Sequence, residues 1–370
     1  MTSPAETTAP AEMTSPAETT APAPLAAVTT VLGPVSADDL GITLCHEHLR
    51  NDGALAWHPP AEGDAEGDLI ARHPVRIEFL GRLRQDPYLS RDNVSLDDTA
   101  TAIEEVRRFA DHGGRTLLEV TPDGIGRAPA ELAAIARATG LNIVMGSGFY
   151  LERTHPARVR SMTAADVAEE IERDLTEGVD GVRAGVIGEI GVSPDFTSEE
   201  EKVLRGAARA QARTGVPLSV HLPGWVRHGH RVLDVVAEEG GRLDGTVLSH
   251  LNPSGADRDY QVSLALRGAY LGYDMCGMDY LYPGEGQSPC DEDNAAAVAW
   301  LVRAGLGHKV LLSQDVFLKT MLVRYGGTGY AHILTGFVPR LHRHGLTADD
   351  TARLLAGNPR ELFLAAARGH

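Results

Sequence analysis

The stretch Ile42–His48, which reads ITLCHEH, decides the predicted fold of this chain. It begins as a short apolar run and ends in two histidines that lie two residues apart. In a β-strand this spacing places both imidazole rings on the same face. An open doubly wound fold would normally have a glycine-rich phosphate loop after its first strand, and His46 and His48 occupy that place here. The stretch therefore predicts a strand that ends in metal-ligand side chains.

Seven further apolar runs of strand length follow, at Thr116–Thr121, Ile143–Gly146, Gly185–Ile190, Leu218–His221, Thr246–His250, Ala269–Asp274 and Val310–Asp315. Polar, alanine-rich segments with helical spacing lie between them, for example at Asp97–His112, Ala130–Thr139, Ala164–Thr176, Ser198–Thr214, Ala256–Arg267 and Asn294–Ala304. Strands that alternate with helices of this size are typical of βαβ units and a parallel sheet. Eight such units favour closure, so the sequence predicts the α/β class and a (β/α)₈ TIM barrel.

The segments before and after the first strand have a different character. Residues 1–12 and 13–24 are near copies of each other, rich in Pro, Thr, Ala and Glu, and predict a disordered repeat tail. This tail lacks the basic and apolar regions of a secretory signal. Residues 25–40 predict a short hairpin, and residues 50–95 form a long insertion. We expect residues 25–370 to form a single metal-dependent hydrolase barrel domain.

The charge, hydropathy and cysteine content of the chain exclude several classes of binding partner. The chain has 34 Lys and Arg against 51 Asp and Glu, a formal net charge of −17, which repels nucleic acid and anionic membranes. The sequence contains no run of 18 apolar residues, so a membrane span is not predicted. Cys45, Cys276 and Cys290 are too few for a disulfide framework and lack the spacing of a thiolate zinc site, so we expect a cytoplasmic location. A small-molecule substrate is the expected partner, and a homodimer is left open.

Metal-type ligands fall at the carboxyl ends of predicted strands: His46, His48, Glu189, His221, His250 and Asp315. One histidine at the end of an apolar run is usually a boundary residue, but in a barrel all these strand ends meet at one rim. Imidazole and carboxylate suit zinc and its first-row neighbours, so zinc is expected, with manganese, cobalt or iron as alternatives. Six ligands exceed the roughly three protein ligands of a mononuclear catalytic zinc site. The pattern therefore predicts two divalent metal ions per chain.

The ligands divide between the two expected metals. We expect His46, His48 and Asp315 to bind the buried metal, and His221 and His250 to bind the more exposed one. A bridge is needed to hold two cations about 3.5–4 Å apart, and Glu189 is expected to supply it together with a water or hydroxide. The bridging hydroxide is the expected nucleophile. Asp315 and Glu189 are therefore the expected catalytic residues, and Asp315 also accepts the proton that the nucleophile loses.

Several of these segments together resemble the phosphotriesterase family of the amidohydrolase superfamily. They are GPVSADDLGITLCHEHL at 33–49, AGVIGEIG at 184–191, VHLPG at 220–224, LSHLNP at 248–253 and LLSQD at 311–315. The resemblance runs from residue 33 to the NPRELF segment at 358–363. It implies a (β/α)₈ barrel with a binuclear metal centre held by the six positions above.

One position departs from many members of that family, which bridge their metals with a carboxylated lysine. This chain has Glu189 there, and its three lysines, Lys202, Lys309 and Lys319, lie elsewhere in the sequence. The chain is thus similar to the phosphotriesterase-related branch in which glutamate replaces the modified lysine. The segment YGGTGYAHIL at 325–334 is also similar to that branch.

The resemblance and the ligands leave the substrate open. Carboxyl ester or lactone hydrolysis is placed first, amide (N-acyl) hydrolysis second and phosphotriester hydrolysis third, while the non-enzyme alternative is a metal-containing ligand-binding protein. Tyr150, Tyr273 and Asp274 end strands at the same rim and are candidate substrate contacts, although aromatic strand ends more often pack. The loop at 275–292 has the length of a lid or binding loop.

Overall fold

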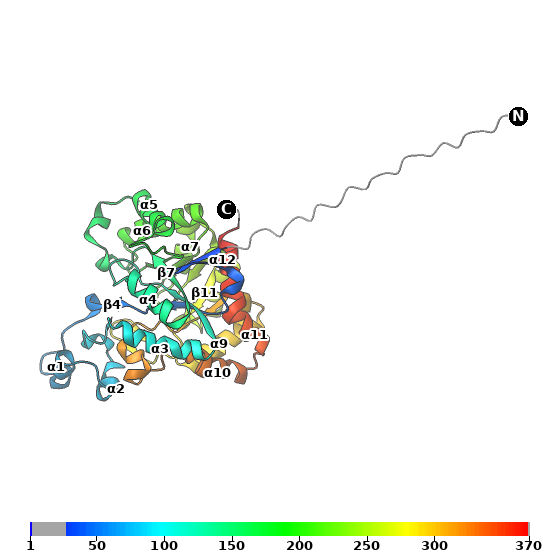
Figure 1. Ribbon diagram of the computed structural model, residues 1–370. Helices are drawn as coiled ribbons and strands as arrows, with labels where there is room; N and C mark the ends of the chain where they lie inside the picture. The colour runs from blue at the N-terminus through cyan, green and yellow to red at the C-terminus, as the bar shows by residue number, and fades with distance from the viewer. Residues whose placement is uncertain (2–26, 369–370) are drawn as a thin grey trace.

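The computed structural model describes Met1 and residues 27–368 (Figure 1). The repeat tail predicted for residues 1–24 falls, apart from Met1, outside the described residues. The chain then forms an antiparallel pair, β1 (Ala27–Thr30) and β2 (Gly33–Ser36), which confirms the predicted hairpin. Val31 N–H donates to Ile143 O at 2.9 Å, so the hairpin lies against the start of the third barrel strand.

Eight parallel strands form one sheet whose spatial order follows the chain. They are β3 (Ile42–Glu47), β6 (Gly114–Glu119), β7 (Asn142–Ser147), β8 (Val186–Gly191), β9 (Leu218–His221), β10 (Thr246–Leu248), β11 (Tyr270–Tyr273) and β14 (Val310–Leu312). The first and last strands meet, because Asp315 N–H donates to His46 O at 3.3 Å and His46 N–H donates to Ser313 Oγ at 3.0 Å. The sheet is therefore a nearly closed barrel, as predicted.

Helices surround the barrel on the outside (Figure 1). They are α3 (Thr99–Asp111), α4 (Pro129–Thr139), α5 (Ala164–Thr176), α6 (Ser198–Thr214), α7 (Gly229–Glu238), α8 (Arg258–Leu266), α9 (Asp291–Arg303), α10 (Val338–Arg343), α11 (Ala348–Ala352) and α12 (Asn358–Ala366). The α6 helix begins with a capping box of Thr197 and Glu200 and buries Val203, Leu204 and Ala207. Small residues let it approach α5 closely, since a Cβ at Gly206 would lie 2.5 Å from Val167.

Two additions lie beside the mouth of the barrel. The insertion after β3 contains β4 (Asn51–Asp52), α1 (Ala65–Arg72), α2 (Leu80–Leu83) and β5 (Ser95–Leu96). It has its own apolar cluster of Ile70, Val75, Phe79, Leu83 and Leu89. The loop after β11 contains a small hairpin, β12 (Leu281–Tyr282) and β13 (Gly286–Gln287). Both additions supply side chains to the cavity above the barrel.

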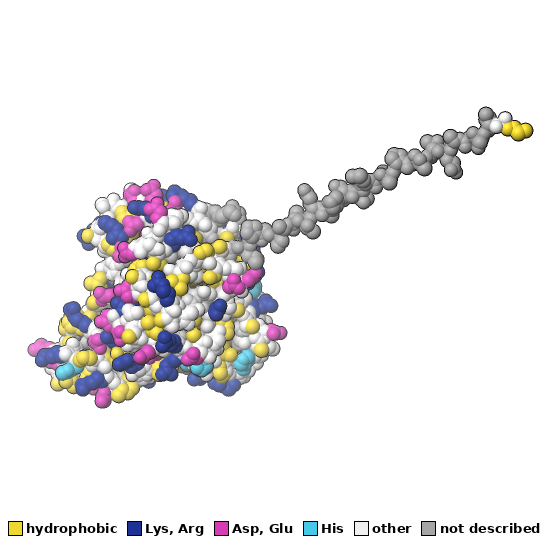
Figure 2. Space-filling model, in the orientation of Figure 1, with side chains coloured by type: hydrophobic (Ala, Val, Ile, Leu, Met, Phe, Trp, Pro, Cys, Tyr) yellow, Lys and Arg dark blue, Asp and Glu magenta, His cyan; other side chains and the backbone are white. Residues whose placement is uncertain are grey.

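The surface agrees with the mixed charge of the sequence. Figure 2 shows acidic and basic side chains interspersed over the face that it presents. Within the described residues, helices long and apolar enough to cross a membrane are absent.

Candidate metal centre

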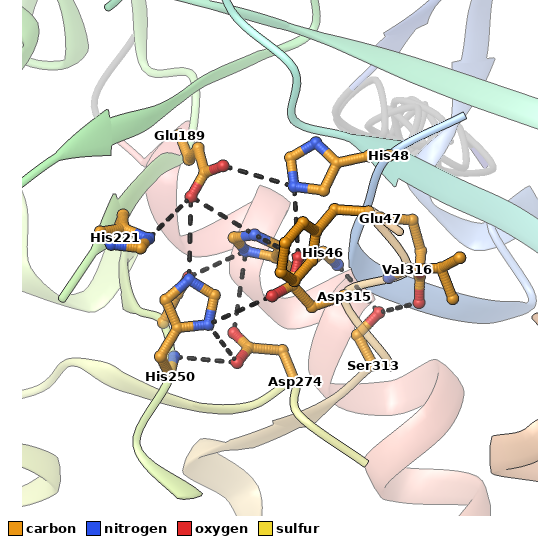
Figure 3. Close-up of polar contacts among 12 residues, drawn as sticks. His46, Glu47, His48, Glu189, His221, His250, Asp274, Ser313, Asp315 and Val316 are labelled. Atoms are coloured by element: carbon orange, nitrogen blue, oxygen red, sulfur yellow. Dashed lines mark hydrogen bonds and ion pairs between the residues drawn. The ribbon is translucent and has the colours of Figure 1, made fainter. Parts of the chain in front are cut away.

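The six predicted ligands converge at the carboxyl ends of β3, β8, β9, β10 and β14 (Figure 3). Glu189 lies at the centre of the group. Its Oε1 is 3.3 Å from His48 Nε2, and its Oε2 is 3.2 Å from His221 Nδ1, 3.5 Å from His46 Nε2 and 3.8 Å from His250 Nε2. Asp315 Oδ1 lies 3.2 Å from His48 Nε2. One carboxylate thus faces four imidazoles, which is the arrangement expected of a bridge between two cations.

The backbone of β8 is built for a close approach at this point. Gly188, directly before Glu189, has φ +122°, a conformation that side-chain-bearing residues rarely adopt. A Cβ on Gly188 would lie 2.3 Å from Ser219 O in β9. Glycine is therefore required there by both conformation and space, and it lets β8 bring the short Glu189 side chain to the centre of the rim.

Two of the other ligands have left-handed backbone conformations. His250 has φ +59° and Asp315 has φ +51°. Such conformations cost free energy in non-glycine residues and persist where the surroundings hold them. Asp274 helps to hold His250, because its Oδ1 accepts hydrogen bonds of 2.9 Å from both His250 N–H and His250 Nδ1.

Hydrogen bonds on the Nδ1 side orient three of the four imidazole rings. His48 Nδ1 is 2.8 Å from Thr121 Oγ1, His46 Nδ1 is 3.1 Å from Ser249 Oγ, and His250 Nδ1 contacts Asp274 as described. In each ring Nε2 is then the nitrogen that faces the central carboxylates. This is the arrangement of metal-ligating histidines, whose second nitrogen is fixed by a partner that sets the tautomer.

Burial and opposite charges act together on the titration of the cluster. Burial alone would lower the pKa of His48, but Asp315 and Glu189 outweigh it and raise the pKa to about 9. Burial would raise the pKa of Glu189, but His46, His221 and His250 hold it well below its usual range. The carboxylates therefore stay ionised and attract positive charge into a buried site. Divalent cations supply such charge and displace protons from their ligands.

The donor set also fits a metal at the level of single atoms. His46 Nε2 and Glu189 Oε2 are buried and have no hydrogen-bond partner among the described residues. An unpaired buried polar atom costs about 1–3 kcal/mol, a penalty that coordination would remove. The ligand atoms of His46, His48 and Asp315 lie within 4.8 Å of one another, and those of His46, Glu189 and His250 do the same.

The first of these groups is the one predicted for the buried metal. The second contains the predicted bridge and one of the two ligands expected at the more exposed metal. His221 belongs to neither group, and it reaches the cluster through its contact with Glu189 and a ring–ring distance of 4.5 Å to His250.

Glu47, which lies between the two histidines of the segment at 46–48, has a role that was not predicted from the sequence. Its carboxylate is fully buried and accepts hydrogen bonds from Ser313 Oγ at 2.8 Å, Gln314 N–H at 2.9 Å and Val316 N–H at 3.0 Å. These donors flank Asp315, so Glu47 holds the segment that presents this ligand. Burial raises the pKa of Glu47 to about 7, although the same hydrogen bonds act to lower it.

We expect Glu47→Ala to destabilise the protein, because it leaves buried donors unpaired at about 1–3 kcal/mol for each. Thermal unfolding of the variant should show a clearly lower midpoint than the wild type, with a lower metal content. Glu62→Ala, at an exposed position, is the control and should unfold like the wild type. An unchanged midpoint for Glu47→Ala would show that the segment around Asp315 is held by other contacts.

A cavity of about 990 Å³ lies above the ligands. Aromatic and thioether side chains form much of its wall: Tyr88, Tyr150, Trp225, Met275, Met278, Tyr282 and Phe317. Tyr282 stacks on Phe317 with ring centroids 6.4 Å apart. Tyr88 comes from the insertion and Tyr282 from the β12–β13 hairpin, and neither was singled out in the sequence. Their only sequence signal was their place in long segments that follow barrel strands.

The three candidate substrate contacts have different positions. Tyr150 lines the cavity, and its hydroxyl is 3.3 Å from both ring nitrogens of His221. Tyr273 does not line the cavity: its side chain is fully buried, and its hydroxyl donates to Gln261 Oε1 at 2.5 Å. Asp274 is likewise absent from the cavity wall, and its carboxylate orients His250.

The sequence of the chain matches known proteins of one family. The sequence profile of the Phosphotriesterase family matches residues 26–363. N-acetyltaurine hydrolase of Tetraodon nigroviridis is 35% identical over 340 residues, which cover 90% of this chain and 97% of the relative. N-acetyltaurine hydrolase of Homo sapiens is 34% identical with the same coverage.

Solved structures of similar proteins have the same fold as this chain. A resiniferatoxin-binding protein from Rhodobacter sphaeroides superposes with a TM-score of 0.90 at 50% identity, covering 93% of this chain and 97% of that protein. A lactonase from Listeria monocytogenes, at 22% identity, shares the fold with a TM-score of 0.72 over 91% of this chain and 98% of its own. The family profile and the N-acetyltaurine hydrolase relatives show that the protein is a hydrolase of the phosphotriesterase-like type. From its profile, its relatives and its barrel, the chain belongs to the phosphotriesterase family.

Proposed function

We propose that this protein is a metal-dependent amide hydrolase that acts on N-acylated amines carrying an anionic group. The observation that carries the proposal is the match to N-acetyltaurine hydrolases along 97% of their length, together with the ligand cluster. N-acetyltaurine is an amide whose amine part ends in a sulfonate. Esters and lactones, placed first from the sequence, move to second place, because the lactonase at 22% identity supports the fold alone.

We propose that His46, His48 and Asp315 hold one divalent cation and that His221 and His250 hold another, with Glu189 between the two. The imidazole-rich donor set favours zinc, with manganese, cobalt or iron as alternatives. When bound, such a pair of cations supplies Lewis acidity, which lowers the pKa of water and polarises a carbonyl group.

Asp315 is the proposed proton acceptor. It lines the cavity, and burial would raise the pKa of its carboxyl, but the hydrogen bond with His48 and the charges of His250 and His46 keep this pKa below its usual range. The carboxylate is therefore ionised at neutral pH and can take a proton from attacking water at an oxygen atom. Amide cleavage also requires a proton on the leaving nitrogen, and the protonated Asp315 is placed to return it.

The cavity wall contributes by excluding water and holding the acyl group. Tyr88, Tyr282 and Phe317 offer an apolar surface beside the ligand cluster. The volume of about 990 Å³ is at the upper end of the roughly 300–1,000 Å³ of pockets that enclose drug-sized molecules. An acetyl group would leave much of this surface uncovered, so acyl groups larger than acetyl are included in the proposed substrate class.

We expect kcat/KM to rise along a series of N-acyltaurines from acetyl to hexanoyl. Burial of one methylene is worth about 0.8 kcal/mol, so each added carbon should raise kcat/KM by up to about fourfold. Steady-state kinetics on the series checks this expectation. The result that contradicts it is a preference for acetyl over every longer chain.

A direct test of the proposed function is a hydrolysis screen with metal-loaded enzyme. The substrates are N-acetyltaurine, N-acyl amino acids, a γ-lactone, an aryl ester and paraoxon, with metal-free enzyme as the control. We expect the anionic amides to show the highest kcat/KM. Faster turnover of the lactone or the aryl ester than of every amide would reverse the proposed order.

The proposal also covers the domain organisation, the location and the partners of the protein. We propose that residues 25–370 act as one catalytic domain. Cys45, Cys276 and Cys290 are all free thiols, which supports the proposed cytoplasmic location. The proposed partner is a small molecule, and the oligomeric state is left open between a monomer and a homodimer.

A further inference from the structure

Glu119 and Thr121 form a buried polar pair beside the ligand cluster. Glu119 ends β6 and Thr121 follows two residues later, so extended backbone directs both side chains to the same side. Both side chains are fully buried, and the Thr121 hydroxyl donates to Glu119 Oε1 at 2.7 Å. Neither residue lines the cavity above the ligands. The pair therefore acts on other protein groups and does not touch a substrate.

The Thr121 hydroxyl joins Glu119 to the His48 ring. Thr121 Oγ1 lies 2.8 Å from His48 Nδ1, while His48 Nε2 faces the central carboxylates. When Nε2 binds a cation, the ring carries its proton on Nδ1 and donates it to the hydroxyl. The hydroxyl in turn has one proton, with Glu119 Oε1 at 2.7 Å and Arg50 O at 2.9 Å as acceptors. The charged carboxylate is the stronger acceptor, so a chain of two hydrogen bonds runs from His48 to Glu119.

The backbone on both sides of His48 is held as well. Glu119 Oε1 accepts a hydrogen bond of 3.1 Å from the N–H of Leu49, the residue directly after His48. The Tyr330 hydroxyl donates to His48 O at 2.6 Å. One carboxylate thus fixes the ring through Thr121 and the following amide directly, which leaves the His48 side chain little freedom to turn away from the cluster.

Glu119 is an unusual group to bury, because its hydrogen-bond donors are neutral. They include the Leu49 amide, the Thr121 amide and the Thr121 hydroxyl, and within the described part of the chain no Lys or Arg side chain forms an ion pair with it. A buried carboxylate without a paired cation is costly. A cation bound at His48 Nε2 would offset that cost, since the hydrogen-bonded chain connects it to the carboxylate.

We propose that Glu119, acting through the Thr121 hydroxyl, is a positioning residue that sets the affinity of the buried metal site. The negative charge at the end of the chain strengthens the imidazole as a ligand and fixes which ring nitrogen carries the proton. The inference rests on the proposed function and refines one of its two metal sites, because His48 belongs to one of the two ligand groups described above and is absent from the other.

The test measures zinc binding to metal-free protein in four variants: Thr121→Val, Thr121→Ser, Glu119→Gln and Thr116→Val. Zn²⁺ is titrated in competition with a chelating dye, which gives a Kd for each of the two binding steps. Thermal unfolding of the metal-free variants is followed on the same preparations. Thr116→Val is the matched control, because Thr116 is fully buried in the same strand and its hydroxyl donates to Leu40 O at 2.6 Å, at the opposite end of the barrel.

Thr121→Val keeps the shape of the side chain but leaves His48 Nδ1 without an acceptor. We expect the Kd of one zinc-binding step to rise by about 10- to 100-fold, the usual cost of losing an outer partner of a metal ligand, and the other to stay within about threefold. Glu119→Gln keeps an acceptor for the hydroxyl but removes the charge, so it should raise the Kd of the same step by about tenfold.

The other two variants separate this role from a purely structural one. Thr121→Ser keeps the hydroxyl and should bind zinc with close to the wild-type affinity. Thr116→Val loses a buried hydrogen bond, as Thr121→Val does, so both should unfold at a lower temperature in the metal-free form. Only Thr121→Val should also lose zinc affinity.

Other results would overturn the inference. Wild-type zinc affinity in Thr121→Val or in Glu119→Gln would reject the chain from Glu119 to His48. An equal loss of affinity in Thr116→Val, an equal loss in both binding steps, or no recovery in Thr121→Ser would make the effect a general one on the fold. Failure of the proposed function looks different, because the wild type itself would then bind fewer than two zinc ions, or would bind two without hydrolysing any of the amides.

Discussion

Glu189→Gln is expected to abolish almost all hydrolytic activity. Loss of an outer partner of a metal ligand already costs about 10- to 100-fold, so loss of the proposed bridge itself should lower kcat/KM by more than about 100-fold. The expected loss follows from the negative charge of the Glu189 carboxylate. Glu189 faces His46 and His48 on one side and His221 and His250 on the other. A neutral amide of the same shape cannot offset the charge of the two proposed cations. Hydrolysis of N-acetyltaurine and the metal content of the variant are the measurements.

Reconstitution with metal, with and without bicarbonate, distinguishes a bridging glutamate from a carboxylated lysine. Lys202 pairs with Glu199, Lys319 pairs with Asp92, and Lys309 lies over the ring of Tyr270, so all three lysines are engaged away from the rim. Metal reconstitution should therefore be indifferent to added bicarbonate. The control is Glu199→Gln, which changes another carboxylate of the cavity wall and should keep most activity. A Glu189→Gln enzyme with both metals and full turnover would mean that Glu189 is not the bridge.

Asp315→Asn should lower kcat by about 10²–10⁴-fold, the usual range for loss of general acid–base assistance, with a smaller effect on KM. The amide keeps the shape of the side chain but cannot accept the proton from water. Steady-state kinetics on N-acetyltaurine checks the result, and metal content is measured in parallel because Asp315 is also a proposed ligand. Asp195→Asn, at an exposed part of the same wall, is the control. Full metal occupancy with near-normal kcat would rule out the proton-acceptor role.

The barrel and its rim could be predicted because they depend on local patterns and on a closed topology. The run predicted at Ile42–His48 forms β3 over Ile42–Glu47, and the run at Ala269–Asp274 forms β11 over Tyr270–Tyr273. Once eight parallel strands close, their carboxyl ends must meet. The convergence of ligands from β3, β8 and β14 then follows without any knowledge of long-range contacts.

The direction of the Tyr273 side chain could have been predicted from strand geometry. Neighbouring residues in a strand point to opposite faces, so Tyr273 and Asp274 could not both face the mouth of the barrel. Asp274 points inward to His250, and Tyr273 points outward to Gln261 in α8.

Other parts of the site could not be reached from the sequence. Tyr88 comes from the insertion after β3 and Tyr282 from the β12–β13 hairpin, and their contact, with ring centroids 5.9 Å apart, depends on how these two segments fold over the rim. Glu47 was overlooked for a related reason. Its partners Ser313 and Val316 lie at the far end of the chain and meet it only when the barrel closes.

The number of metal ions that the protein binds is the most direct test of the proposed binuclear centre. Purified protein is stripped of metal, reconstituted with excess zinc, freed of unbound zinc and analysed for metal per chain, and its amide hydrolysis is followed at each step. We expect about two zinc ions per chain and activity that rises as the second ion binds. One ion or none per chain, with activity retained, would contradict it.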